Sequence, residues 1–126
     1  MPQGSTTLHE SEERLSPATR DMHRAIVSLM EELEATDWYL QRAEATEDAE
    51  LREVLLHNRE EEQEHAAMVL EWIRRHDRTF EAKLREYLFT EGSIVQREKA
   101  LDKGEAARAN GTSSVSLGSL RGGGRR

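Results

Sequence analysis

Apolar residues recur along the first third of the chain with the period of an α-helix. Ser16 and Pro17 are typical of a helix start, with a serine N-cap and a proline in the first turn. Spacings of four and three residues then place one apolar stripe on this segment, formed by Met22, Ile26, Leu29, Leu33, Thr36 and Leu40. Because no glycine and no further proline interrupts it, the pattern predicts a long helix over residues 16–44.

A second long helix is predicted from about Thr46 to Arg75. Thr46 precedes two acidic residues, which complement the positive end of a helix dipole, and the segment closes on basic residues. Each helix would reach about 43 Å at a rise of 1.5 Å per residue. A connection of about two to four residues makes the two helices antiparallel neighbours.

The remaining segments are predicted to be shorter or less ordered. A short third helix is expected from about Arg78 to Phe89, ended by Gly92. Residues 1–15 are polar and unpatterned, which predicts a disordered N-terminus. Residues 97–126 are charged and then rich in glycine, serine and arginine, which predicts a flexible tail. The helical domain is therefore expected to span residues 16–96.

The fold class is predicted to be all-α, because the helical stripes are long and strand signals are absent. A hairpin of two helices leaves an apolar side of each helix uncovered. A second copy of the chain, related by a two-fold axis, would cover that side and complete a four-helix bundle. We therefore predict a two-helix antiparallel hairpin with a short C-terminal helix, completed by dimerisation.

The composition and net charge indicate which class of molecule the chain could bind. Charged residues make up 34% and hydrophobic residues 36% of the 126 residues, so the chain can bury only a small core by itself. The net charge is −7, and the acidic excess lies before residue 97. An acidic body favours cations as partners and argues against a nucleic acid.

Residue types that are absent exclude several chemistries. The chain has no cysteine, which excludes disulfides, thiolate metal sites and cysteine nucleophiles. It has no run of about 18 apolar residues that could span a membrane, and its N-terminus lacks the apolar region of a signal peptide. We expect a cytoplasmic protein without a membrane partner.

Polar residues interrupt the apolar stripe of the second helix. That stripe consists of Leu51, Leu55, Asn58, Glu62, His65, Val69 and Trp72. An ionised Glu62 inside a bundle costs several kcal/mol unless it is paired or coordinated. A metal ion is one group that compensates such a charge.

The first helix carries a matching acid. Glu32 and Tyr39 lie seven residues apart beside the apolar stripe, and Tyr39 could hydrogen-bond a ligand carboxylate or a bound oxygen species. Di-iron carboxylate bundles take one Glu from each of two helices and a Glu-x-x-His pair from each of the other two. Glu32, Glu62 and His65 are half of that set. A two-fold dimer would complete it, and its oxygen and imidazole ligands suit iron or manganese.

Other interpretations stay open. The Glu-x-x-His spacing is common in a glutamate-rich chain, so a non-catalytic coiled-coil scaffold or adaptor fits the same pattern. A manganese or peroxide-directed di-metal enzyme is a third hypothesis. Glu61, four residues before His65, offers a competing pair, and His57 one turn earlier could also bind a metal.

A further acidic group lies on the first helix. Glu31 and Glu34 share a stripe with Trp38, away from Glu32. They form either a solvated face or an entrance to a metal site, because clustered carboxylates raise the local concentration of cations.

Short segments in three regions of the chain resemble the encapsulated ferritins. The segments that resemble their two helices are His23–Ser28, Met30–Ala35 and Asp37–Tyr39, then His57–Arg59, Glu61–Glu62, Glu64–Met68 and Leu70–Trp72. Tyr87–Gly92 resembles the part that follows these helices in that family. The resemblance covers about residues 20–92.

This resemblance implies a half-ferritin of two helices, whose copies pair into a bundle and whose dimers form a ring-shaped decamer. The family's ligands for two iron ions per dimer interface fall on Glu32, Glu62 and His65 of both chains, with Tyr39 nearby, and its entry-site residues fall on Glu31 and Glu34, beside Trp38. The implied activity is that of a ferroxidase, which oxidises Fe²⁺ with dioxygen. Storage of the oxidised iron would belong to a surrounding encapsulin shell.

The tail carries a second resemblance. Residues 115–121 are similar to the short C-terminal peptide that docks cargo inside encapsulin shells. A flexible segment with spaced apolar residues can become ordered in a groove of a partner. The predicted docking residues are Leu117, Gly118, Ser119, Leu120 and Arg121. The resemblance thus implies a cytoplasmic protein held inside an encapsulin nanocompartment.

Overall fold

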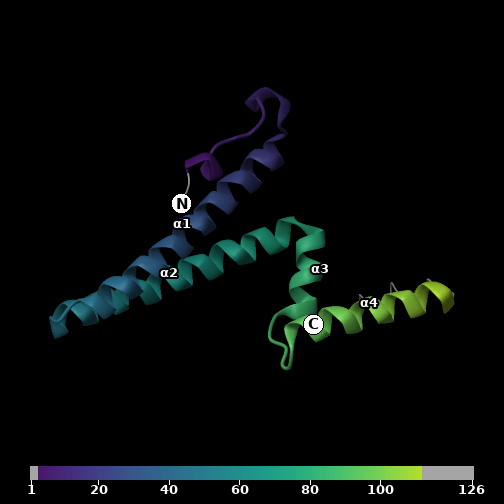
Figure 1. The fold of residues 1–126 in the computed structure, drawn as a ribbon. Helices are drawn as coiled ribbons and strands as arrows, with labels where there is room; N and C mark the ends of the chain where they lie inside the picture. Colours follow the sequence, from purple (N-terminus) through teal and green to yellow (C-terminus); the bar gives the residue numbers. More distant parts are fainter. Residues whose placement is uncertain (1–2, 112–126) are drawn as a thin grey trace. The chain divides into compact units, whose positions relative to one another are not determined.

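The fold, seen in a computed structural model, is helical throughout the part of the chain that is described (Figure 1). The structure describes residues 3–111, with side chains from residue 4 to residue 104. Its elements are the 3₁₀ helices η1 (Gln3–Thr6) and η2 (Glu12–Arg14) and the α-helices α1 (Pro17–Ala45), α2 (Ala49–His76), α3 (Arg78–Tyr87) and α4 (Ile94–Gly111). The predicted all-α class is confirmed.

Helix α1 begins where the sequence predicted. The Ser16 side chain accepts a hydrogen bond from the main-chain N–H of Thr19 at 3.1 Å, and Pro17 occupies the first turn. This arrangement satisfies a main-chain donor that the first turn leaves without a helical partner. The helix ends at Ala45, one residue beyond the predicted boundary.

Helix α2 begins later than predicted, because Asp48 rather than Thr46 is its N-cap. Asp48 Oδ1 accepts from the main-chain N–H of Leu51 at 3.0 Å. Thr46 instead accepts from the N–H of Asp48 at 3.2 Å and stabilises the connection. Both residues have capping chemistry, and the carboxylate is also favoured by the positive end of the helix dipole.

The two long helices lie side by side and antiparallel, and they bury very little (Figure 1). Ala43, Ala66 and Ile73 are the buried residues of the described chain. Leu33 and Met68 remain 55% and 63% exposed on the same hairpin. A small core and exposed large apolar side chains are what the composition predicted for one copy.

Helices α3 and α4 belong to a second compact unit that begins at Thr79. After α3, Phe89 and Gly92 have φ values of 60° and 85°, in the left-handed region that breaks a helix. Ser93 then caps α4, because its Oγ accepts from the N–H of Gln96 at 3.1 Å. Helix α4 covers the start of the segment expected to be a flexible tail. It lacks a marked apolar side, so periodicity could not indicate it.

The segment before α1 also has more structure than expected. It forms the two 3₁₀ helices, and Arg20 Nη1 of α1 donates to the carbonyl of Glu12 at 3.1 Å. A hydrogen bond of this kind leaves no hydrophobic pattern in the sequence. Within residues 3–111, no helix is both long and apolar enough to cross a bilayer.

Candidate metal centre

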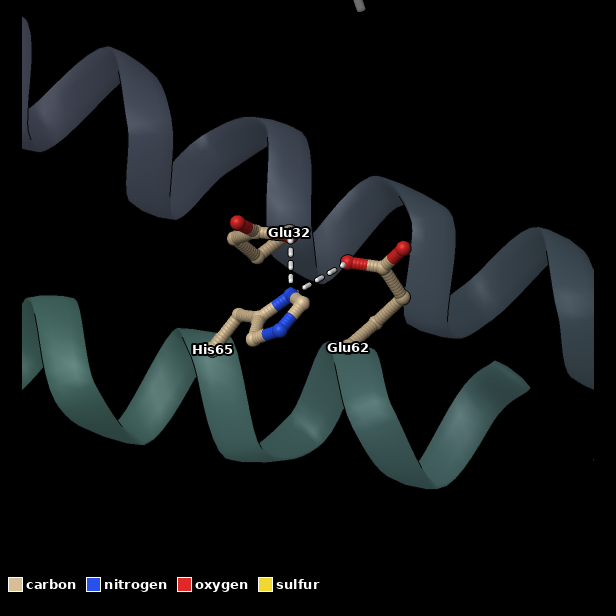
Figure 2. A group of neighbouring side chains, drawn as sticks. All are labelled: Glu32, Glu62 and His65. Atoms are coloured by element: carbon tan, nitrogen blue, oxygen red, sulfur yellow. Dashed lines mark hydrogen bonds and ion pairs between the residues drawn. The ribbon is translucent and has the colours of Figure 1, made fainter. Parts of the chain in front are cut away.

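Two carboxylates and one imidazole meet between α1 and α2 (Figure 2). Glu32 comes from α1, and Glu62 and His65 come from α2. One potential ligand atom of each residue lies within 4.8 Å of those of the other two. His65 Nδ1 is 3.3 Å from Glu62 Oε1 and 3.8 Å from Glu32 Oε1. The structure thus brings together the three residues that the spacing singled out as ligands.

Local helix geometry places these side chains. Glu62 and His65 are one turn apart and project from the same side of α2. Glu32 reaches them from the facing helix (Figure 2). The side chains of Glu32 and Glu62 are 26% and 24% exposed, and that of His65 is 47% exposed. The centre is therefore half-buried and open on one side.

The two carboxyl groups perturb each other. A hydrogen bond with Glu62, followed by partial burial, raises the pKa of Glu32 above its ordinary value. The same bond, together with His65, lowers the pKa of Glu62. The physical cause is that two like charges this close repel each other, and the hydrogen bond favours a proton on Glu32 over one on Glu62.

This donor set fits a divalent cation. A cation neutralises the paired carboxylates, and it also accepts the lone pair of a neutral imidazole. Carboxylate oxygen and imidazole nitrogen together suit iron or manganese, while no thiolate is present to favour softer ions. One chain supplies three ligands, so a bound ion would retain open positions on the exposed side.

The remaining acids of α1 lie outside this group. Among the described residues, the group of potential metal ligands contains neither Glu31 nor Glu34. Glu31 is exposed, and its charge contributes to the raised pKa of Glu32. It therefore acts on the centre electrostatically without joining it. Its role as an entry residue stays a prediction, as does that of Glu34.

Trp38 and Tyr39 share a different neighbour. The Arg42 guanidinium carbon lies 5.7 Å from the ring centroid of Trp38 and 5.6 Å from that of Tyr39. Both distances are within the range of cation–π attraction. Arg42 was not singled out from the sequence, although its place one turn after these aromatic residues is a signal for such a contact.

The competing histidine pairing is not the one adopted. Glu61 Oε2 lies 3.4 Å from His57 Nε2, and both side chains are more than half exposed. His65 is paired with Glu62 and Glu32 instead. Glu61 and His57 thus form a surface pair one turn apart on α2.

The sequence pattern did not indicate a role for one further residue near the centre. Arg59 of α2 donates from Nε to the main-chain carbonyl of Thr36 in α1 at 3.2 Å. A signal was available, because Arg52 stands seven residues earlier and makes the same kind of bond. The predicted docking residues Leu117–Arg121 lie outside the described part of the chain.

Comparison with known proteins decides the family. The model of the family described as EncFtn-like matches residues 7–91, a range that includes both long helices and α3. The chain belongs to the EncFtn-like family. The resemblance seen in the two helices is therefore confirmed, and all three residues of the candidate centre fall within the matched range.

Two relatives support membership of the EncFtn-like family. The chain is 52% identical over 130 residues to an "Encapsulated ferritin-like protein" of Rhodospirillum rubrum, covering 97% of this chain and 93% of the relative. It is 47% identical over 96 residues to a "Ferritin-like protein" of Thermotoga maritima, covering 76% of this chain and 84% of the relative.

A solved structure is similar as well. The crystal structure of protein ne0167 from Nitrosomonas europaea matches with a TM-score of 0.67 and 59% sequence identity. The match covers 69% of this chain and 96% of that chain. This EncFtn-like chain thus shares its helical fold with a protein of clearly related sequence.

Proposed function

We propose that this EncFtn-like protein is a ferroxidase that oxidises Fe²⁺ to Fe³⁺ with dioxygen. The observation that carries the proposal is the group formed by Glu32, Glu62 and His65, with ligand atoms within 4.8 Å of one another. Fe²⁺ is the substrate. Two ferrous ions would give up two electrons, which reduce one dioxygen to hydrogen peroxide with the uptake of two protons.

The proposed centre is shared by two copies of the chain. One copy offers two carboxylates and one imidazole, so a two-fold dimer offers four carboxylates, which neutralise two divalent ions. Leu33 and Met68 are more than half exposed, and Met68 borders a groove of about 500 Å³ between α1 and α2. An apolar surface of this kind supports burial against a second copy.

Each ligand has a part that follows from its chemistry. The pKa of Glu32 is raised, so a cation competes with a proton for this carboxylate and metal binding is coupled to proton release. Glu62 would bridge two ions, and His65 would supply a nitrogen donor. Glu31 and Glu34 would attract Fe²⁺ beside Trp38, and Tyr39 would hydrogen-bond a ligand carboxylate.

The proposed destination of the oxidised iron is an encapsulin nanocompartment. The printed name of the Rhodospirillum rubrum relative, an encapsulated ferritin-like protein, supports this part of the proposal. The segment Leu117–Arg121 would dock the chain to the shell, and dimers would assemble into a ring-shaped decamer. The shell would then store iron that the chain oxidises.

Oxygen consumption tests the activity directly. We expect Fe²⁺-dependent uptake of dioxygen by the wild type and a loss of most of it in Glu32→Ala, Glu62→Ala and His65→Ala. Undiminished uptake in all three variants would exclude the proposed centre. Elemental analysis of the purified protein separates the alternatives, because a scaffold binds no metal and a manganese enzyme carries manganese.

A further inference from the structure

Two arginines of α2 reach across the hairpin to main-chain carbonyls of α1. Arg59 Nε donates to Thr36 O at 3.2 Å, and Arg52 Nε donates to Ala43 O at 3.0 Å. The arginines are seven residues apart, and so are their acceptors, so the bonds repeat with the heptad of an antiparallel helix pair. Neither arginine forms an ion pair with a described residue, and Arg52 Nη2 donates in addition to the carbonyl of Thr46.

The heptad-spaced positions of α2 that include Arg52 and Arg59 are apolar farther along the helix. The next two positions at heptad spacing are Ala66 and Ile73, which are buried at 8% and 2% exposure. The contact between the helices therefore changes character along its length. Near the connection it includes arginine–carbonyl bonds beside the buried Ala43, and toward the end of α2 the heptad-spaced positions contribute the buried Ala66 and Ile73.

The candidate metal centre lies at this change. Glu62 follows Arg59 by one turn of α2, and Glu32 precedes Thr36 by one turn of α1. Thr36 Oγ1 also donates to the carbonyl of Glu32 at 2.8 Å. Hydrogen bonds thus connect Arg59 through the main chain of α1 to the residue that carries one of the ligands.

A bond of this type restricts how the two helices can slide. Apolar contacts between small side chains tolerate axial displacement, whereas a hydrogen bond to one carbonyl needs a short distance and a favourable angle. A shift of one helical turn is about 5.4 Å. It would exceed the 4.8 Å within which the ligand atoms of the centre lie.

We propose that Arg59 is a positioning residue for the metal centre, because its bond to Thr36 sets the axial register of α1 against α2 beside Glu32. The inference rests on the proposed function, since it concerns the same site. The charge of Arg59 acts in the opposite direction, because a guanidinium near Glu62 repels a cation. Removing that charge alone should strengthen metal binding. A loss of metal affinity on removal of Arg59 would therefore come from a changed position of the ligands.

Matched variants separate the bond from the charge. Arg59→Gln keeps an N–H donor at the position of Nε and removes the charge. Arg59→Met keeps a similar unbranched stem and removes both donor and charge. Arg52→Met removes a bond of the same kind two turns farther from the centre, together with the Arg52 bond to the Thr46 carbonyl. The full-length chain would be titrated with Co²⁺ by calorimetry and visible absorption, with helix content checked by circular dichroism.

We expect Arg59→Met to lose on the order of 10-fold in Co²⁺ affinity, as is usual for residues that orient metal ligands, and to shift the Co²⁺ absorption band. The Arg59→Gln and Arg52→Met variants should bind Co²⁺ at least as tightly as the wild-type protein does. Wild-type affinity in Arg59→Met, or an equal loss in Arg59→Gln, would overturn the proposal. A loss of helix in Arg59→Met alone would assign the bond to folding and overturn it too.

The same titration distinguishes this inference from the proposed function. A wild type that binds no Co²⁺, or a Glu62→Ala variant that binds it equally well, would reject the metal centre and the inference together. Binding that depends on Glu62 but not on Arg59 would reject the inference alone.

Discussion

Glu32 of α1 and Glu62 of α2 are hydrogen-bonded across the hairpin. This bond raises the pKa of Glu32 and lowers that of Glu62, so Glu32 is the first of the two carboxylates to take up a proton as the pH falls. A proton on Glu32 and a divalent cation both relieve the repulsion between the two carboxylates. Occupancy by metal and protonation of Glu32 are therefore alternatives.

A Glu32→Gln variant should separate stability from metal chemistry. The amide can donate to Glu62 as the protonated acid does, so we expect the thermal unfolding midpoint without metal to be retained. Fe²⁺-dependent oxygen consumption should fall by about 100-fold or more, because a ligand is lost. Glu60→Gln, on the exposed face of α2, is the matched control and should keep full activity. Wild-type oxygen uptake in Glu32→Gln would contradict the assignment.

The acids beside the centre should affect uptake rather than chemistry. Glu31 is exposed, yet its charge reaches Glu32. In a Glu31→Ala/Glu34→Ala double variant we expect a higher KM for Fe²⁺ and an unchanged kcat, with the difference diminished by added salt. Steady-state oxygen uptake at several Fe²⁺ concentrations measures both constants. Unchanged kinetics at low salt would reject the hypothesis that Glu31 and Glu34 form an entry site for Fe²⁺.

Metal and self-association should be linked. Ions that bind only the paired chains stabilise the pair by mass action. We expect size-exclusion chromatography to show a larger species after anaerobic addition of Fe²⁺, and no such shift in Glu62→Ala. An oligomer of the same size with and without Fe²⁺ in the wild type would contradict this linkage.

Acid stability should depend on Glu71. Hydrogen bonds from Arg74 and then Arg75 lower the pKa of Glu71 from its ordinary 4.5 to about 2. A carboxyl whose pKa is lower in the folded state stabilises it fully above the unfolded pKa. That contribution is lost as the pH falls from 4.5 to about 2.

Glu71→Gln should consequently lower the urea midpoint near neutral pH by an amount that shrinks as the pH falls through this range. Arg74 Nε and Nη2 each lie 2.7 Å from a Glu71 oxygen, so Arg74→Gln is the partner variant for a double-mutant cycle. A difference in urea midpoint between the wild type and Glu71→Gln that stays constant with pH would contradict a stabilising pair between Glu71 and Arg74.

Removal of residues 112–126 should leave the chemistry intact and abolish encapsulation. The metal centre lies between α1 and α2, so truncation after Gly111 should not change Fe²⁺-dependent oxygen uptake. Co-expression with a shell protein, followed by analysis of the shell contents, measures the second effect. A Leu117→Ala/Leu120→Ala variant of the full chain tests whether the apolar residues are responsible. Normal loading of the truncated chain would reject the tail as the docking peptide.

The pattern of the chain was sufficient for the elements whose apolar residues recur every three or four positions. It predicted both long helices and α3, and the Ser16 cap. It missed α4, where no apolar side exists, and it chose Thr46 over Asp48 as the second cap. Helix periodicity and a spacing of one turn also singled out Glu32, Glu62 and His65, because residues on one helix face share a known geometry.

What the sequence by itself determined is therefore local: which segments are helical, which side of each is apolar, and which polar residues interrupt that side. Tertiary structure decided which residues meet. It brought Glu32 of α1 to Glu62 and His65 of α2, and it joined Arg59 to the main chain of Thr36. The physical reason is that axial register between two helices depends on distances between side-chain and main-chain atoms, which one-dimensional spacing along either helix does not contain.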